Sequence, residues 1–366
     1  MEKTNNLLLF IISFLFLLCF SSCVSSIEFK VKSIYVFGDS IFDAGNNHYN
    51  KYSAAQADFP PYGSTFFHRP TGRFTDGRTV ADFLSQFLGL PLQKPFMEIQ
   101  LEFVNGTRKS YPTNGINFAS AGSGVLSTTN LDLNVTALEV QVEQFGTLIE
   151  EKHIKKGQVK ESLFLLESGS NDIFNYFSPF EPAPTLTPDA YIQDMLKRVE
   201  SFVDQIYRLG ARRIAIFSLG PVGCVPARSL LPGAPTNNRC YGKMNKMVKN
   251  FNMGLENIVK GIPYKHHGAV GVYGAVYKSV QLFRANATRY GFNDVNNACC
   301  GYGTLGGQLQ CGKEGYTICS EPNRYLFWDY FHPSERTYKL LSKALWAGRP
   351  TSIRPINIKT LAKINI

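Results

Sequence analysis

The chain has 366 residues, of which 44% are hydrophobic and 13% aromatic, and its formal net charge is +10. This composition excludes an intrinsically disordered chain, and the length is compatible with one large α/β domain. The positive charge favours adsorption to acidic polymers, but without a dense Lys/Arg block or a recognisable module it does not indicate nucleic-acid binding. A basic surface that simply faces solvent is the main expectation.

Residues 1–26 have the pattern of a secretory signal peptide. A short polar start precedes an apolar run, Leu7–Phe20, and the small residues of SSCVSS follow it. This run is short for a membrane span of about 20 residues, so a retained anchor is the weaker alternative. We expect cleavage within Ser22–Ser26, no stable membrane anchor, and a single domain over residues 27–366.

Short apolar runs alternate with longer helical patterns through the rest of the chain, which is typical of βαβ units around a parallel sheet. The expected strands are Ser33–Gly38, Ser162–Ser168, Arg212–Leu219 and Gly268–Tyr273. The expected helices are Thr79–Leu88, Ala137–Lys152, Pro188–Leu209, Tyr241–Lys260 and Ser334–Ala347. Pro188 and Pro333 stand where a first helical turn accepts proline. The sequence therefore predicts an α/β fold with a mainly parallel central sheet.

Cysteine usage agrees with export. Of the eight cysteines, Cys19 and Cys23 fall near or within the predicted signal peptide, which leaves six in the C-terminal half. These six are Cys224, Cys240, Cys299, Cys300, Cys311 and Cys319. They are expected to form disulfides, and six cysteines allow about 15 pairings among which the sequence does not choose. No CxxC pair is present, and we expect His266 and His267 to be surface histidines, so no metal site is predicted.

Surface loops are the expected location of three N-glycosylation sequons, at Asn105, Asn134 and Asn286. The longest loops are expected at Asn46–Gly77, 219–239 and 293–324. Loops of this length in a compact domain usually form functional walls or disulfide-held insertions. We expect them to shape a cleft above the sheet.

Ser40 is the first residue that could carry chemistry. It lies in YVFGDSIFDAGNN, where the first expected strand ends, and the carboxyl ends of parallel strands are where α/β proteins place their sites. A serine hydroxyl is a poor nucleophile until a base removes its proton. Ser40 alone would therefore be read as an ordinary serine in a strand-to-helix turn.

The segment YLFWDYFHPSE offers the base. His332 precedes Pro333, which disfavours helical geometry at the histidine and would hold it on a loop before the last helix. Asp329, three residues earlier, could orient the imidazole and stabilise its protonated form. The competing interpretation is a helix entry in which both side chains bond only backbone groups.

Two further segments offer hydrogen-bond donors for an oxyanion. Gly122 lies in NFASAGSGVL, and Asn171 lies in ESGSNDIF immediately after an expected strand. The backbone N–H groups of Gly122 and Ser40 and the amide of Asn171 could stabilise the negative charge of an acyl-transfer transition state. The glycine assignment could also fall on Gly124. Taken singly, the Gly122 segment would be interpreted as a flexible turn and the Asn171 segment as a helix cap.

Together these four blocks resemble the plant GDSL esterase/lipase family of the SGNH hydrolase superfamily, and the resemblance covers nearly the whole mature chain. The blocks, in chain order, contain GDS, Gly122, GSND and DYFHP, and the stretches FDAGNN, RPTGRFTDGR, LGPVGCVP and ACCGYG are also similar to this family. The chain departs from it at Ile41, where the family has leucine, and at Ala121, where it often has glycine. The GxSxG elbow of α/β-hydrolases is absent around Ser40.

The resemblance implies a three-layer α/β/α fold and a secreted serine esterase or lipase that cleaves acyl esters through an acyl-enzyme. In it Ser40 is the nucleophile, His332 the base, Asp329 its orienting acid, and Gly122 and Asn171 complete the oxyanion hole. No metal or cofactor is expected, and a plant protein of this kind would lie in the apoplast near acidic cell-wall polymers. Acyl transfer by the same site, and a non-catalytic extracellular binding or defence protein, remain alternatives. The substrate could be a lipid, a polyester or an acetylated polysaccharide.

Overall fold

The computed structural model describes residues 28–180, 184–235 and 240–366, so the predicted signal peptide lies outside the described residues. A seven-stranded sheet with the order β11-β6-β5-β4-β1-β3-β2 forms its centre. These strands are β1 (Ser33–Gly38), β2 (Lys94–Pro95), β3 (Ile116–Asn117), β4 (Ser162–Glu167), β5 (Arg213–Phe217), β6 (Val270–Gly274) and β11 (Ile353–Arg354). All neighbours pair in parallel except β11, which runs antiparallel to β6. The expectation of a mainly parallel sheet is confirmed.

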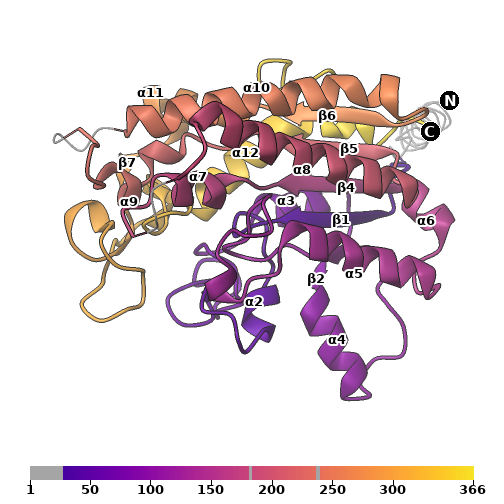
Figure 1. Ribbon diagram of the computed structural model, residues 1–366. Coiled ribbons are helices and arrows are strands. Elements are labelled where there is room, and N and C mark those ends of the chain that lie inside the picture. The colour runs from indigo at the N-terminus through magenta and orange to yellow at the C-terminus, as the bar shows by residue number, and fades with distance from the viewer. Residues whose placement is uncertain (1–27, 181–183, 236–239) are drawn as a thin grey trace, which may run out of the picture.

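Helices cover both faces of this sheet (Figure 1). On one face α8 (Pro188–Arg208) packs against both α5 (Leu138–Glu150) and α10 (Gly242–Lys265), and α5 and α10 contact the strands β1 and β6, respectively. On the other, α12 (Glu335–Ala347) packs against α3 (Val80–Phe87) and α13 (Ile358–Leu361). Two glycines of β6 face opposite layers, because a Cβ on Gly271 would meet α10 and one on Gly274 would meet α12. The three-layer α/β/α expectation is therefore confirmed.

The remaining elements are short or lie at the sheet edges and the site end. The helices are α2 (Asn46–Tyr49), α4 (Phe96–Val104), α6 (Lys156–Lys160), α7 (Ser170–Tyr176), α9 (Pro226–Ser229) and α11 (Val276–Ala285). Short 3₁₀ turns span Leu131–Leu133, Val222–Cys224, Thr288–Tyr290, Thr304–Gly306 and Pro322–Arg324. Two small sheets pair β7 (Asp294–Ala298) with β10 (Tyr325–Phe327), and β8 (Cys300–Gly301) with β9 (Thr317–Ile318). Among the described residues no helix is long and apolar enough to span a bilayer.

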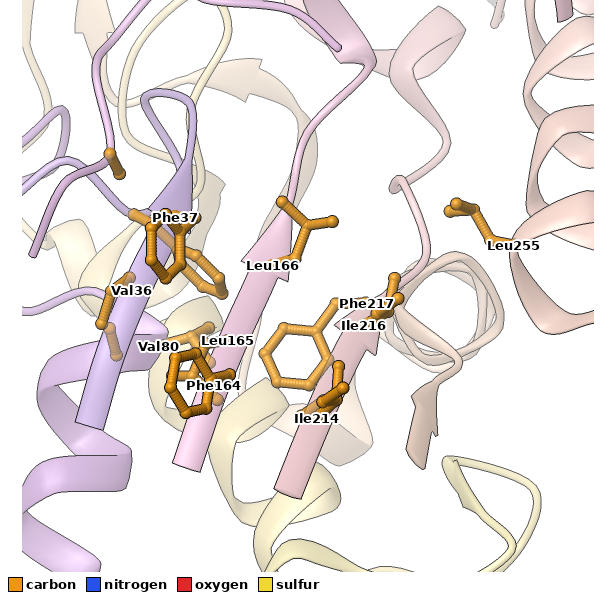
Figure 2. Close-up of a cluster of buried hydrophobic side chains, with 14 of the residues drawn as sticks. Val36, Phe37, Val80, Phe164, Leu165, Leu166, Ile214, Ile216, Phe217 and Leu255 are labelled. Carbon is orange, nitrogen blue, oxygen red and sulfur yellow. The ribbon is translucent and has the colours of Figure 1, made fainter. Parts of the chain in front are cut away.

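The central strands are buried along their whole length, as expected for a sheet covered on both faces. Figure 2 shows the side chains of β1, β4 and β5 in one cluster, joined by Val80 of α3 and Leu255 of α10. Phe37 at the end of β1 stacks on Phe118 with ring centroids 5.2 Å apart. This packed core supports the carboxyl end of β1 and the serine that follows it.

The four expected strands and five expected helices are all present, with ends shifted by a few residues. Helix α10 continues to Lys265, beyond the expected end at Lys260, with Pro263 in its last turn. The placement of Pro333 in a first helical turn is wrong. Ser334 is the N-cap of α12, since its side chain accepts the Thr337 N–H, and Pro333 therefore lies outside the helix.

The prediction of two surface histidines after α10 is wrong for His266. Its ring is only 6% exposed, because the chain end of α10 turns it toward α8. There Nε2 lies 2.7 Å from the Asp204 carboxylate and the ring packs edge-on against Tyr207. His267 is exposed, as expected.

All six cysteines of the C-terminal half are paired. The disulfides are Cys224–Cys240, Cys299–Cys319 and Cys300–Cys311. The last two clamp the loop that carries Gln310, one of the walls of the cavity described next. Disulfide formation is thus confirmed, and one pairing is selected from those the sequence left open.

Candidate active site

The four candidate blocks meet at the carboxyl edge of the central sheet. Ser40 follows β1, Gly122 follows β3 and Asn171 follows β4, and these three strands are neighbours in the sheet. Together with His332 they line one cavity of about 350 Å³. Residues up to 292 positions apart therefore share one site, at the place where α/β folds bind their ligands.

Ser40, His332 and Asp329 form a continuous hydrogen-bonded chain. The Ser40 Oγ atom lies 2.8 Å from His332 Nε2, and His332 Nδ1 lies 2.8 Å from Asp329 Oδ1. His332 is 6% exposed and Asp329 is fully buried, whereas Ser40 is partly open to the cavity. This arrangement has the geometry of a nucleophile, a base and a group that orients the base.

The Asp329 carboxylate is held from three sides. Oδ1 accepts the backbone N–H groups of Phe331 and His332, at 2.9 and 2.8 Å. Oδ2 accepts the Tyr62 hydroxyl at 2.6 Å. Burial, followed by the charge of Asp329, raises the pKa of Tyr62 well above its usual range, so the phenol stays a neutral donor. Sequence reasoning missed Tyr62, which lies in an irregular loop far from Asp329 in the chain.

A tight turn carries Ser40. The Asp39 carbonyl accepts the N–H groups of Phe42 and Asp43, and its side-chain Oδ1 accepts the Ile41 N–H at 3.0 Å. Gly38 precedes this turn with φ +139°, and a Cβ there would lie 1.9 Å from the Glu167 carbonyl oxygen of β4. Glycine is therefore required for β1 and β4 to approach so closely just before Ser40.

Behind the turn lie the buried carboxyl groups of Asp39 and Glu167, which are close enough for the charge of Asp39 to act on Glu167. Within the described residues, neither Asp39 Oδ2 nor Glu167 Oε2 has a hydrogen-bond partner. Burial raises the pKa of Asp39 to about 6, and burial together with the Asp39 charge raises the pKa of Glu167 well above its usual range. Two adjacent buried carboxylates repel, so this pair binds protons more readily than exposed carboxyl groups do. Sequence reasoning assigned neither residue a part in the site.

Ser40 and Gly122 both line the cavity, and their backbone N–H groups have no acceptor in the described residues. The Asn171 side-chain nitrogen gives one hydrogen to the Ser123 carbonyl at 2.9 Å, which leaves its second hydrogen available. Gly122 adopts φ +85°, which favours glycine, whereas Gly124 lies against the Asp172 carboxylate and does not line the cavity. Of the two glycines, Gly122 is the one positioned to contact a ligand.

The FDAGNN stretch connects the Gly122 loop to the turn that carries Ser40. Asp43 accepts the N–H of Ala121 at 2.9 Å as well as N–H groups of its own turn. Asn46 donates to the carbonyls of Asn117 and Ala119, and Asn47 donates to that of Ala121. Two segments remote in sequence are thus held at a constant separation, which a preorganised oxyanion site needs.

The RPTGRFTDGR stretch supports the histidine side. Phe74 packs on the His332 ring with centroids 4.8 Å apart. Arg73 forms a buried two-point ion pair with Asp82 of α3, and Arg78 pairs with Glu335 at the start of α12. These contacts join the loop to the helices that flank the imidazole.

The cavity walls are mainly apolar. Aromatic and aliphatic side chains from the sheet edge, α11 and α12 form them, including Phe42, Phe217, Val276, Val280, Leu341 and Leu345. Arg228 brings a cationic group into the same wall. In the described ranges no three His, Cys, Asp or Glu side chains gather where a metal ion could be held.

All three sequon asparagines, Asn105, Asn134 and Asn286, are exposed. Asn105 and Asn286 stand at helix ends, and Asn134 follows a short 3₁₀ turn beside Leu133, a residue of the cavity wall. Their side chains are therefore accessible to modification.

The family model described as GDSL-like Lipase/Acylhydrolase matches residues 34–345. The chain is 64% identical over 332 residues to GDSL esterase/lipase 6 of Arabidopsis thaliana, with 91% of each chain covered. It is 32% identical to GDSL esterase/lipase 5 of the same plant, over 92% of this chain and 88% of that protein. It is also 30% identical to a GDSL lipase of Tanacetum cinerariifolium, over 94% and 92% of the two chains.

Proposed function

The chain belongs to the GDSL-like lipase/acylhydrolase family and is a carboxylic ester hydrolase, and we propose that Ser40 is its nucleophile. The observation that carries this proposal is the hydrogen-bonded chain from Ser40 Oγ through His332 to Asp329, with 2.8 Å at each link. In this proposal His332 is the general base and Asp329 orients it. Family membership sets aside the non-catalytic alternative.

In the first half of the reaction, His332 Nε2 takes the Ser40 proton while Oγ attacks the ester carbonyl carbon. The carbonyl oxygen becomes an oxyanion, which the N–H groups of Ser40 and Gly122 and the free hydrogen of Asn171 stabilise. When the tetrahedral intermediate collapses, His332 passes its proton to the leaving alcohol. An acyl group then remains on Ser40 Oγ as an ester.

In the second half, His332 takes a proton from water, and the resulting hydroxide attacks the acyl carbon. The same donors stabilise the second oxyanion. Collapse releases the carboxylic acid, and the proton on His332 returns to Ser40 Oγ. Asp329, held by Tyr62 and two backbone N–H groups, keeps Nδ1 protonated throughout, so that Nε2 stays available to the substrate side. Acyl transfer would use the same intermediate with an alcohol in place of water.

The apolar cavity behind Ser40 supports an ester whose acyl chain is at least several carbons long. Its volume, about 350 Å³, lies at the lower end of the range for small-molecule sites. A hydrocarbon chain that enters it leaves water for walls such as Phe217 and Leu345. Among lipid, polyester and acetylated-polysaccharide esters, this cavity favours the first two.

Secretion is part of the proposal. Three disulfides are typical of oxidising compartments, and three exposed sequons suit a glycoprotein that passes through the secretory pathway. The signal-peptide pattern of residues 1–26 agrees with this, and we propose that residues 27–366 form the mature single-domain enzyme. Expression with a tag at the C-terminus, followed by N-terminal sequencing of the exported protein, tests the cleavage.

The Ser40→Ala variant tests the catalytic proposal. It removes one oxygen from a partly open side chain, so the fold and the melting temperature should stay as in the wild type. Hydrolysis of p-nitrophenyl butyrate should fall by a factor of roughly 10⁴ or more. Ser127→Ala makes the same exchange at another partly buried serine, one that does not line the cavity, and is the matched control that should retain most of the activity. A folded Ser40→Ala variant with wild-type turnover would refute the proposal.

A further inference from the structure

Arg228 holds an unusual position in the cavity wall. It lies on the short helix α9, four residues after Cys224 and inside the loop that the Cys224–Cys240 disulfide closes. Its guanidinium stacks on two phenylalanine rings, at 4.4 Å from the centroid of Phe174 and 4.9 Å from that of Phe331. Phe174 is three residues after Asn171, and Phe331 directly precedes His332. The cationic group is therefore close to both sides of the proposed catalytic centre.

The Arg228 guanidinium has no hydrogen-bond acceptor and no carboxylate partner within the described residues. Its Nε atom is buried and unpaired. Desolvation lowers the pKa of Arg228 to about 10, which still leaves the group charged at neutral pH. A desolvated charge without a partner destabilises a folded protein, so this site has a cost in the absence of a ligand.

Other arginines of the described chain that are not exposed have the acceptors that Arg228 lacks. Arg73, Arg78, Arg108 and Arg354 pair with carboxylates. Arg212, Arg213, Arg284 and Arg336 donate to backbone carbonyls. For Arg228 the structure shows ring stacking but no such acceptor among the described residues, and it is also the one of this group that lines the cavity holding Ser40. Arg228 therefore borders the space that a substrate would occupy.

We propose that Arg228 is a substrate-recognition residue that binds a carboxylate carried by the ester at a distance from the reacting carbonyl. The proposal rests on the proposed function and names a substrate class for it, esters that bear a second, ionised carboxyl group. The two phenylalanine rings hold the guanidinium plane, and its paired N–H donors match the two oxygens of a carboxylate. The apolar remainder of the cavity accepts the chain that links the two ends of the substrate.

A matched pair of substrates tests this recognition. Mono-p-nitrophenyl glutarate and p-nitrophenyl pentanoate have acyl chains of five carbons and differ in a terminal carboxylate. The ratio of their kcat/KM values, acidic over neutral, should fall by roughly 10- to 100-fold in Arg228→Met, the range for loss of one charge-assisted pair. Arg228→Lys keeps the positive charge but loses the paired N–H donors. Its ratio of kcat/KM values should lie between those of the wild type and of Arg228→Met.

The control is Arg349→Met, which makes the same exchange at an exposed arginine. It should leave the ratio as in the wild type, which separates the local contact from the change in net charge. If Arg228→Met also leaves the ratio unchanged while both esters are turned over, the proposal is overturned.

A binding measurement keeps this inference separable from the catalytic proposal. Isothermal titration of glutarate into Ser40→Ala should detect binding, and the double variant Ser40→Ala/Arg228→Met should bind at least tenfold more weakly. This readout needs no turnover, so it stands even if Ser40 is not the nucleophile. Equal affinities in the two variants, or no binding in either, would overturn the role of Arg228 without bearing on Ser40.

Discussion

The hydroxyl of Tyr62 donates a 2.6 Å hydrogen bond to Asp329 Oδ2, across 267 positions of sequence. Gln310, on the loop closed by the Cys300–Cys311 disulfide, donates in turn to the Tyr62 oxygen at 3.2 Å. The orientation of the proposed acid is therefore connected to a loop that a disulfide holds. This connection lets the acid be tested without changing any residue of the proposed triad.

Tyr62→Phe should lower kcat roughly tenfold and change KM little. The reason is that one carboxylate oxygen loses its charge-assisted donor, and Asp329 then orients the imidazole less well. Steady-state kinetics on p-nitrophenyl butyrate measure both values. Tyr111→Phe, which removes a hydroxyl bonded to Gln100 away from the site, is the control and should behave as the wild type. A wild-type kcat in Tyr62→Phe would exclude a part for this bond in orienting Asp329.

Replacing both Cys300 and Cys311 by serine should cost about 3 kcal/mol of unfolding free energy, the value for a short closed loop. Chemical denaturation measures this loss. Because Gln310 then no longer supports Tyr62, kcat should also fall at temperatures where the protein is fully folded. Unchanged kcat in the folded double variant would show that the disulfide serves stability alone.

The Asp39 and Glu167 pair predicts a pH dependence of stability. Burial raises both pKa values above those of the unfolded chain, so the folded protein binds extra protons. The resulting stabilisation is complete below about pH 4 and is lost as pH rises through the folded pKa values. In Glu167→Gln the unfolding free energy should fall less steeply with pH, by up to about 1.4 kcal/mol per pH unit for one proton. Urea denaturation at a series of pH values from 4 to 8 measures this slope.

Glu161→Gln is the control for this pair. It makes the same exchange at an exposed position directly before the first residue of β4, whereas Glu167 is its last. Its slope should equal that of the wild type. A Glu167→Gln variant with an unchanged slope would mean that no proton is held between the two carboxyl groups.

The apolar cavity predicts a dependence on acyl chain length. From p-nitrophenyl acetate upward, kcat/KM should rise by up to roughly fourfold for each added methylene until the cavity is filled. Val276→Phe places a larger ring in the cavity wall and should remove the gain for long chains while acetate is still hydrolysed. Val140→Phe, at an exposed position of α5, should leave the series unchanged. A flat series in the wild type would contradict acyl binding in this cavity.

Local pattern was enough to predict most of the fold. Strand β1 was predicted with its observed ends because a short apolar run stops at a glycine. The start of α8 was predicted because Pro188 suits a first helical turn. The two-residue strands β2 and β11 carry no periodicity, so nothing in their sequence indicates them. Pro333 was misplaced because a serine beside it is the better helix cap.

In the proposed site, too, some residues could be predicted from local sequence and others could not. Ser40, Gly122, Asn171 and His332 could be selected because each lies in a short block of characteristic residues, and the fold brings the four to one cavity. Tyr62 and Arg228 could not, because their importance arises from contacts between remote segments that no local pattern records. Glu167 lies in a recognised block, but only its pairing opposite Gly38 shows that it faces Asp39. The disulfide pairing was undetermined for the same reason.

The central claim is that an acyl group is transferred to Ser40, and mass spectrometry of the enzyme during turnover tests it most directly. After mixing with excess p-nitrophenyl butyrate and rapid acid quenching, the intact mass should increase by one butyryl group. Peptide mapping should place that group on Ser40, and Ser40→Ala should gain no mass under the same conditions. A wild-type enzyme that hydrolyses the ester but carries butyryl on another residue, or an equally acylated Ser40→Ala variant, would contradict the account.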